Sequence, residues 1–183
     1  MSAIRTRTIA TTPVKGTALD FPAAVQLGIG GVADNRSFHL IDERGHLPGA
    51  AVDVHPVTIS SAESLAAVAE VAGADVDGRR FRMLIELEGG EPFEEEGWTG
   101  RTRRIGSARA RVGDSVGRCA VITQDPDTAG ADLPLLKVLR DERRARDSAA
   151  RRPRLDRDSI TFGVYAMVTR AGRVSVGEAI AVA

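Results

Sequence analysis

Cys119 carries the most reactive side chain in the sequence, and it is the only cysteine among 183 residues. A lone thiol cannot form an internal disulfide, so it is an inert core residue, a nucleophile or a ligand for a soft metal. Arg118 precedes it, an apolar run over residues 120–122 follows it, and the acidic turn Asp125-Pro126-Asp127-Thr128 comes six residues later. Arg118 would favour the reactive thiolate if its side chain turned towards the sulfur. This setting makes Cys119 the first candidate for a catalytic or metal-binding role.

The composition sets the class of protein in which this thiol works. The 25 basic and 25 acidic residues cancel, and 43% of the chain is hydrophobic, so we expect a globular protein without a nucleic-acid partner. No apolar run approaches the ~18 residues of a membrane span, and residues 1–16 lack a secretory signal. One cysteine argues against a disulfide scaffold and for a reducing compartment. We therefore expect a cytoplasmic protein with no membrane partner.

Short alternating segments indicate that most of the chain forms strands. Pro56 interrupts one of these segments, which we therefore expect at the edge of a sheet. Gly106-Ser107 and Ala171-Gly172 are expected to turn two hairpins. The expected strands are residues 4–10, 21–27, 37–42, 52–59, 81–87, 101–105, 108–112, 119–123, 160–169 and 173–181.

Two segments have helical periodicity. One is expected to start at Ser60, with Ser60 and Glu63 as a capping box, and to stop at Gly73. The other covers residues 133–146 and is expected to be capped by Asp132. The fold class predicted by this pattern is mainly β, barrel-like, with peripheral helices.

Residues 140–157 contain eight arginines and four acids. Such a run is typical of a solvated helix face and loop. A flap facing an anionic, phosphorylated ligand is the alternative.

The segment from Arg118 to Thr128 resembles the hallmark of the MOSC family, the homologues of the C-terminal domain of molybdenum cofactor sulfurase, which include the amidoxime-reducing component and short bacterial proteins. Weaker likenesses follow in the same order along nearly the whole chain. They are Pro13-Val14-Lys15, residues 31–42, residues 56–65, Arg80-Phe81-Arg82, Phe162-Gly163-Val164-Tyr165 and Val176-Gly177-Glu178. The resemblance implies a small N-terminal β lobe over residues 1–50, packed into the same unit as a MOSC domain over residues 51–183.

The resemblance also assigns roles to residues. It implies that Cys119 ligates the molybdenum of a pterin cofactor or carries a sulfane sulfur, since a thiolate suits both tasks. Lys15 and Arg36 match positions similar to the family's pterin-phosphate contacts, Arg82 matches another basic contact, and Arg118 joins this set beside the thiol. Asp53 matches an acid near the metal that would position substrate or move a proton. The plainer alternatives are a buried cysteine, solvated cations and a loop carboxylate.

Three positions depart from the family pattern. Met83 and Leu84 stand where relatives often have Pro-Asn, and Val54 replaces a hydroxyl residue. A missing Asn amide removes a directional hydrogen-bonding group. These changes imply a different ligand, weaker cofactor binding or lost activity.

Three functions follow from the resemblance. The first is a molybdenum cofactor-dependent reductase of N-hydroxylated or N-oxide compounds, supplied by an external electron-transfer protein because the chain lacks a cysteine cluster for an iron–sulfur centre and a flavin motif. The second is a persulfide carrier that works with a separate cysteine desulfurase, because we expect no pyridoxal-phosphate module within these 183 residues. The third is a non-catalytic cofactor-binding module.

Overall fold

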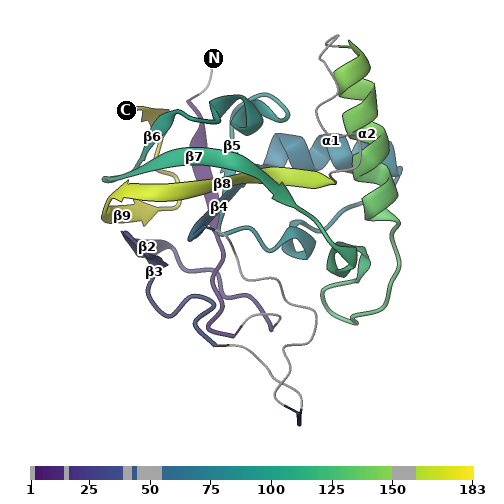
Figure 1. Cartoon of the computed structure of the whole chain (residues 1–183), viewed down its shortest axis with the longest axis horizontal. Helices are drawn as coiled ribbons and strands as arrows, with labels where there is room; N and C mark the ends of the chain where they lie inside the picture. The colour runs from purple at the N-terminus through teal and green to yellow at the C-terminus, as the bar shows by residue number, and fades with distance from the viewer. Residues whose placement is uncertain (1–2, 15–16, 39–42, 45–54, 150–159) are drawn as a thin grey trace.

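The two longest strands, β7 (Ala108–Gly117) and β8 (Thr161–Arg170), follow from alternating sequences. In β7 the buried residues Ala108, Ala110 and Val112 alternate with the exposed residues Arg109 and Arg111, as expected for a strand with one face on a core. β7 pairs with β8 in antiparallel fashion, and both run across the middle of the molecule (Figure 1).

The structure is a computed structural model that describes residues 3–14, 17–38, 43–44, 55–149 and 160–183. The other elements in this part are β1 Arg5–Ile9, β2 Ala24–Gly28, β3 Gly31–Val32, β4 Val57–Ser61, α1 Ala62–Ala72, η1 Gly78–Phe81, β5 Ile85–Glu88, η2 Glu94–Trp98, β6 Thr102–Ile105, η3 Ala120–Thr123, α2 Leu135–Ala149, β9 Gly172–Ser175 and β10 Ile180–Val182, where η marks a 3-10 helix. The predicted fold class, mainly β with peripheral helices, is confirmed.

The main sheet contains seven strands in the order β1-β5-β4-β8-β7-β6-β10. β4 and β5 are parallel and are joined through α1, whereas the other neighbouring strands of this sheet pair in antiparallel fashion in the described residues. The two edge strands meet, because the Thr6 amide donates to the Glu178 carbonyl at 2.9 Å and the Ile180 amide donates to the Ile4 carbonyl at 2.8 Å. The sheet is therefore nearly closed into a barrel. β3, β2 and β9 form a second sheet.

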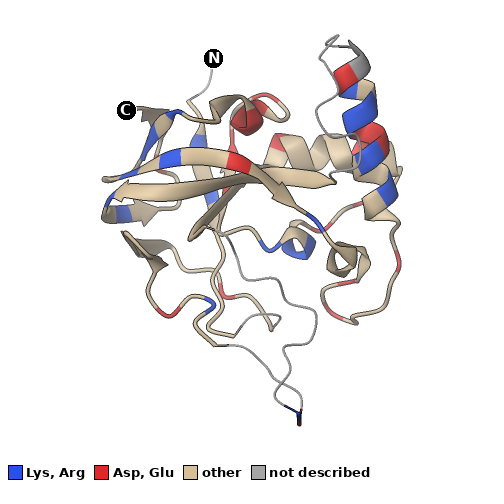
Figure 2. Cartoon of the chain, in the orientation of Figure 1, with Lys and Arg blue, Asp and Glu red and all other residues tan. Residues whose placement is uncertain are grey.

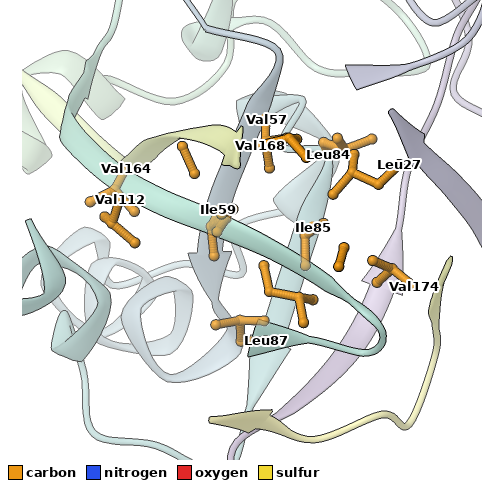
Figure 3. Close-up of a cluster of buried hydrophobic side chains, with 14 of the residues drawn as sticks. Leu27, Val57, Ile59, Leu84, Ile85, Leu87, Val112, Val164, Val168 and Val174 are labelled. Atoms are coloured by element: carbon orange, nitrogen blue, oxygen red, sulfur yellow. The ribbon is translucent and has the colours of Figure 1, made fainter. Parts of the chain in front are cut away.

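The interior of the barrel is aliphatic. Ile59, Ile85 and Val164 come from three neighbouring strands and are fully buried, and their side chains point into one cluster (Figure 3). A second apolar cluster lies under the helices and includes Phe81, Met83, Ile122, Leu139 and Phe162. This second cluster fixes η1, η3 and α2 against the start of β8, where the candidate site lies. In the described residues, no helix is long and apolar enough to cross a membrane.

The predicted strand over residues 119–123 is wrong. Cys119 precedes η3, and the Ile122 amide donates to the Cys119 carbonyl at 3.3 Å. A short apolar run does not distinguish a strand from a helical turn. Here Ile122 is buried while Val121 remains 51% exposed, which is the one-sided burial of a turn.

The position of β4 in the sheet and the capping residue of α1 both differ from the predictions. β4 lies between β5 and β8, so the predicted edge position is wrong; Pro56 lies just before the strand, where its missing N–H costs nothing. The helix is capped by Ser61, whose Oγ accepts from the Ser64 amide, and not by Ser60. Gly73 ends the helix with a left-handed backbone, as predicted.

Two other predictions fail because the partner is distant in sequence. β9 pairs with β2 rather than with β8, so the predicted final hairpin is wrong. Asp132 pairs with Arg80 instead of capping α2.

The predicted strand over 81–87 divides into the end of η1 and β5. The predicted strand over 37–42 lies largely outside the described residues, as does the proposed domain boundary near residue 50.

Candidate functional site

Cys119 lies two residues after the end of β7 and is exposed. The Arg118 amide donates to the Ile160 carbonyl at 2.8 Å, which holds the chain beside the start of β8 before it turns into η3. Cys119 has an extended backbone, and the next turn is anchored by the buried Ile122. The inert, buried alternative is therefore excluded, and the thiol is accessible for chemistry.

Arg118 turns inward and ties three segments together. Its Nε and Nη2 donate to the Phe162 carbonyl at 3.1 and 2.5 Å, and its Nη1 donates to the Phe81 carbonyl at 2.9 Å. Nη2 also lies 2.7 Å from the Met83 sulfur. The guanidinium faces the Phe81 ring, with its carbon 5.5 Å from the ring centre. Arg118 thus positions the chain next to Cys119 against η1 and β8.

Arg36 and Arg82 meet at the same segment. The Arg36 guanidinium donates to the Arg82 carbonyl, and the Arg82 guanidinium donates to the Thr17 carbonyl at 2.6 Å. Both residues have a left-handed backbone, with φ of 55° and 52°, a conformation that non-glycine residues adopt mainly under functional or tertiary constraint. The structure therefore brings Arg36, Arg82 and Arg118 together around residues 81–83.

The acidic turn after η3 is closed by its own side chains. The Asp125 carboxylate accepts from the Thr128 amide at 2.8 Å, from the Thr128 hydroxyl at 3.0 Å and from the Asp127 amide at 3.1 Å. The Asp125 amide donates to the Gly130 carbonyl at 2.8 Å. The Thr128 amide and hydroxyl lower the pKa of Asp125, because they stabilise its charged form.

Two adjacent arginines of η1 clamp this turn. Arg79 forms a two-pronged pair with Asp127 at 2.9 and 2.7 Å, and Arg80 forms one with Asp132 at 2.7 and 2.6 Å. The arginines lower the pKa of Asp127 and of Asp132, respectively. The Arg80 side chain is only 4% exposed, so this pair is held more tightly than an ordinary surface pair. Figure 2 shows the basic η1 near the acidic loop that follows η3.

The segment from Arg118 to Thr128, which resembles the MOSC hallmark, thus forms an ordered structure: Cys119, η3 and an acidic turn held by η1. Comparison with protein families also identifies the MOSC domain. A model of the MOSC domain matches residues 46–181. The chain belongs to the MOSC domain family. Comparison with curated proteins finds no match.

Solved structures share this MOSC fold. YuaD from Bacillus subtilis has a TM-score of 0.63 and 14% identity, over 98% of this chain and 94% of that one. YiiM from Geobacillus stearothermophilus has a TM-score of 0.55 and 13% identity, over 98% and 75%. YiiM from Escherichia coli has a TM-score of 0.52 and 14% identity, over 98% and 69%. At these identities the likeness shows the fold alone.

Several predicted site residues of this MOSC chain lie outside the described part. These are Lys15 and Asp53, so their places relative to Cys119 stay predictions; the departure at Val54 lies outside it too. The two departures at Met83 and Leu84 are described and buried, with 7% and 2% exposure. Met83 contacts Arg118, and Leu84 joins the barrel core. Apolar packing therefore occupies the positions where relatives often carry Pro-Asn.

Gly163 of β8 permits the close packing behind Arg118. Its φ is 72°, and a Cβ there would lie 2.6 Å from the Ile59 carbonyl and 2.5 Å from the Met83 methyl. A side chain would not fit this space without a shift of its neighbours. Close packing therefore explains why the motif Phe162-Gly163-Val164-Tyr165 has glycine at its second position.

Sequence reasoning missed the clamp of Arg79 and Arg80 on the acidic turn. The signal was present as two adjacent arginines before Phe81 and as acids at positions 127 and 132, but their pairing joins residues about fifty positions apart.

A cleft of about 330 Å³ opens between β1, α1 and residues 75–79, with Met83 in its lining. It is not lined by Cys119, Arg36 or Arg118, so it does not define the thiol site.

The described residues suit a metal that arrives with its own ligands. No group of three or more His, Cys, Asp or Glu side chains among them could hold a metal ion. Cys119 alone offers one soft, exposed donor, which fits a metal already bound by sulfur from a cofactor. The Arg36 and Arg118 guanidinium groups that contact residues 81–83 are of the type that binds anionic groups such as a cofactor phosphate. The donor set is therefore compatible with the cofactor associated with MOSC domains.

Proposed function

We propose that this MOSC domain protein binds a molybdenum cofactor through Cys119 and reduces N-hydroxylated or N-oxide compounds. The observation that supports the proposal is an exposed thiol just after the end of β7. The neighbouring Arg118 donates to the Phe81 carbonyl, Arg36 donates to the Arg82 carbonyl, and the Arg82 guanidinium donates to the Thr17 carbonyl. A thiolate and forked cations are the groups that a metal–pterin phosphate would need from a protein.

Each candidate residue has a proposed role in binding the cofactor. Cys119 would supply the protein's ligand to the metal. Arg36 and Arg82, with Lys15 from outside the described residues, would bind the cofactor's phosphate. Arg118 would hold the chain next to Cys119 in place, because its described contacts are with backbone carbonyls and a thioether.

The bound cofactor would supply a metal that changes oxidation state by two electrons. The overall reaction is R–NHOH plus two electrons and two protons giving R–NH₂ and water. Asp53 is proposed to orient the substrate or deliver one proton. An external electron-transfer protein is proposed to supply the electrons.

The test is elemental analysis of protein purified from a host that makes the cofactor. We expect molybdenum in the wild-type protein and little in Cys119→Ser, with reduction of benzamidoxime by reduced methyl viologen in the wild type only. Once the cofactor is removed from both, the two proteins should have the same melting temperature, because the replaced side chain is exposed. Absence of molybdenum from a folded wild-type protein would refute the proposal.

A persulfide carrier is the second candidate, and the accessibility of Cys119 favours it. An exposed sulfur can be reached by a separate cysteine desulfurase and by an acceptor. In the transfer step an acceptor thiolate would attack the outer sulfur, the S–S bond would break, and the Cys119 thiolate would leave. Sulfane sulfur released by cyanide, without bound metal, would favour this candidate.

A non-catalytic cofactor-binding module is the remaining alternative. It is favoured by the apolar packing of Met83 and Leu84, which leaves no polar side chain at these two positions. Molybdenum bound to a protein that reduces no N-hydroxylated substrate would support it.

A further inference from the structure

Three exposed arginines form a row across neighbouring strands of the barrel wall. Arg104 of β6 lies opposite Arg109 of β7, and Arg109 lies opposite Arg170 of β8. Arg111, the next exposed residue of β7, lies opposite Met167, which is 49% exposed. We call these four arginines and Met167 the arginine face. Figure 2 shows basic segments gathered where β6, β7 and β9 come together, away from η3.

The arrangement of the arginine face opposes folding. Like charges directly opposite each other on a sheet repel and destabilise it. Within the described part of the chain, none of the four arginines forms an ion pair with an acid, whereas Arg7, Arg79 and Arg80 elsewhere each form one. All four side chains are exposed, so they do not contribute to the core either. The unfavourable row therefore has no compensation inside the described fold.

We propose that the arginine face docks an acidic surface of a partner protein. Carboxylates placed across the row would neutralise the repulsion and pair with guanidinium groups in a two-pronged geometry. Met167 lies opposite Arg111 beside the row and would supply an apolar contact there; arginine and methionine are both enriched at protein interfaces.

A protein fits this face better than a polyanion. Three neighbouring strands are only about 10 Å across, and the chain as a whole has zero net charge, so a long nucleic acid or an anionic membrane would find few further contacts. The exposed thioether also requires an apolar counterpart, which a phosphate backbone lacks.

The face is separate from the thiol site. Arg111 and Cys119 are eight residues apart along β7 and its extension, or roughly 26 Å at the rise of a strand. A partner on the arginine face would therefore leave Cys119 accessible. The inference does not depend on the proposed reductase activity.

The test uses the full chain and a fluorescent acidic peptide of about twelve residues with a central Leu-Phe pair, followed by anisotropy. We expect binding that weakens as NaCl rises from about 50 to about 300 mM. The double variant Arg104→Gln/Arg109→Gln should bind about tenfold more weakly. The control Arg140→Gln/Arg144→Gln removes the same charge from exposed positions of α2 and should bind as the wild type does.

Met167→Ser provides the second arm. It should weaken binding of the Leu-Phe peptide severalfold but leave a matched peptide with a central Gly-Gly unchanged. Binding that is insensitive to salt, or equal loss in both double variants, would overturn the proposal. Tighter binding of single-stranded DNA or of phosphatidylserine vesicles than of the peptide would overturn it as well. Circular dichroism and melting temperatures would confirm that each variant is folded.

Discussion

Arg118 joins η1, β7 and β8 through one side chain, so its removal should be costly. Arg118→Gln would leave the Phe81 and Phe162 carbonyls short of donors. An unsatisfied buried polar group costs about 1–3 kcal/mol, and we expect a loss of this size in the free energy of unfolding in urea. The control Arg140→Gln, on the exposed side of α2, should change it by less than about 0.5 kcal/mol. Equal urea midpoints for the two variants would show that the Arg118 contacts do not stabilise the fold.

Glu95 of η2 has a buried carboxyl that accepts from the Ser61 and Ser64 hydroxyls at the start of α1. Burial raises the pKa of Glu95, so the folded protein binds this proton more tightly than the unfolded chain. The corresponding stability is fully present below the unfolded pKa of about 4.3 and is lost as pH rises through the higher folded pKa.

Glu95→Gln should remove this dependence on pH. We expect the variant to gain stability relative to the wild type when the pH is raised from 4 to 8, as measured by melting temperature. Glu91→Gln, at an exposed position, should follow the wild type at each pH. A constant difference between Glu95→Gln and the wild type across this range would contradict the assignment.

At the scale of elements, the clamp joins η1 to the chain that follows Cys119 and η3, through the pairs Arg79–Asp127 and Arg80–Asp132. Because Arg80 lowers the pKa of Asp132, this pair contributes stability above the unfolded pKa of about 3.9 and loses it as pH falls through the lower folded pKa. Asp132→Asn should be less stable than the wild type at pH 7, and the difference should shrink as the pH approaches 3. The measurement is the urea midpoint at each pH, with exposed Asp75→Asn as the control.

The effect of this variant should be modest, because the Asp132 side chain is 44% exposed and solvent screens the pair. A second effect is specific to the thiol. If the clamp positions Cys119, Asp132→Asn should change the rate at which iodoacetamide alkylates this single cysteine. An unchanged alkylation rate in a destabilised variant would show that the clamp only supports the fold.

Local signals allowed several elements to be predicted. The β6–β7 hairpin was predicted because alternating residues flank Gly106-Ser107. The end of α1 was predicted because glycine readily takes the left-handed conformation that ends a helix, and Gly73 does so. η3 could not be separated from a strand, since its few apolar residues fit both periodicities. β9 was assigned to a hairpin because its true partner, β2, lies at the other end of the chain.

The same limit applies to the site. Cys119 was predicted as a site residue from its flanking motif; the structure shows that it is exposed, and its role stays a prediction. The inward turn of Arg118 and the joining of Arg36 to the Arg82 carbonyl depend on tertiary contacts that no local pattern contains. The clamp was missed for this reason, because Asp132 has the residue type and position of a helix cap.

At the scale of the whole molecule, contacts between β1 and the segment that leads into β10 close the barrel. Ile180→Pro would remove the amide that donates to the Ile4 carbonyl and disturb the pairing of Ile180 with Ile105. We expect a loss of about 1–3 kcal/mol, with faster hydrogen exchange at the Thr6 amide, which donates to Glu178 nearby. Ile180→Val keeps the amide and should cost only about 0.5–1.5 kcal/mol. Unchanged exchange at Thr6 would show that closure does not depend on this bond.

The pairing of β2 with β9 has a consequence for biosynthesis. Ala24 lies opposite Ser175, so the three-stranded second sheet cannot be completed until residue 175 has left the ribosome. β2 must wait for a partner that is synthesised about 150 residues later, and such non-local pairing slows folding. A ribosome stalled before residue 172 should therefore hold a protease-sensitive nascent chain in which this sheet is absent.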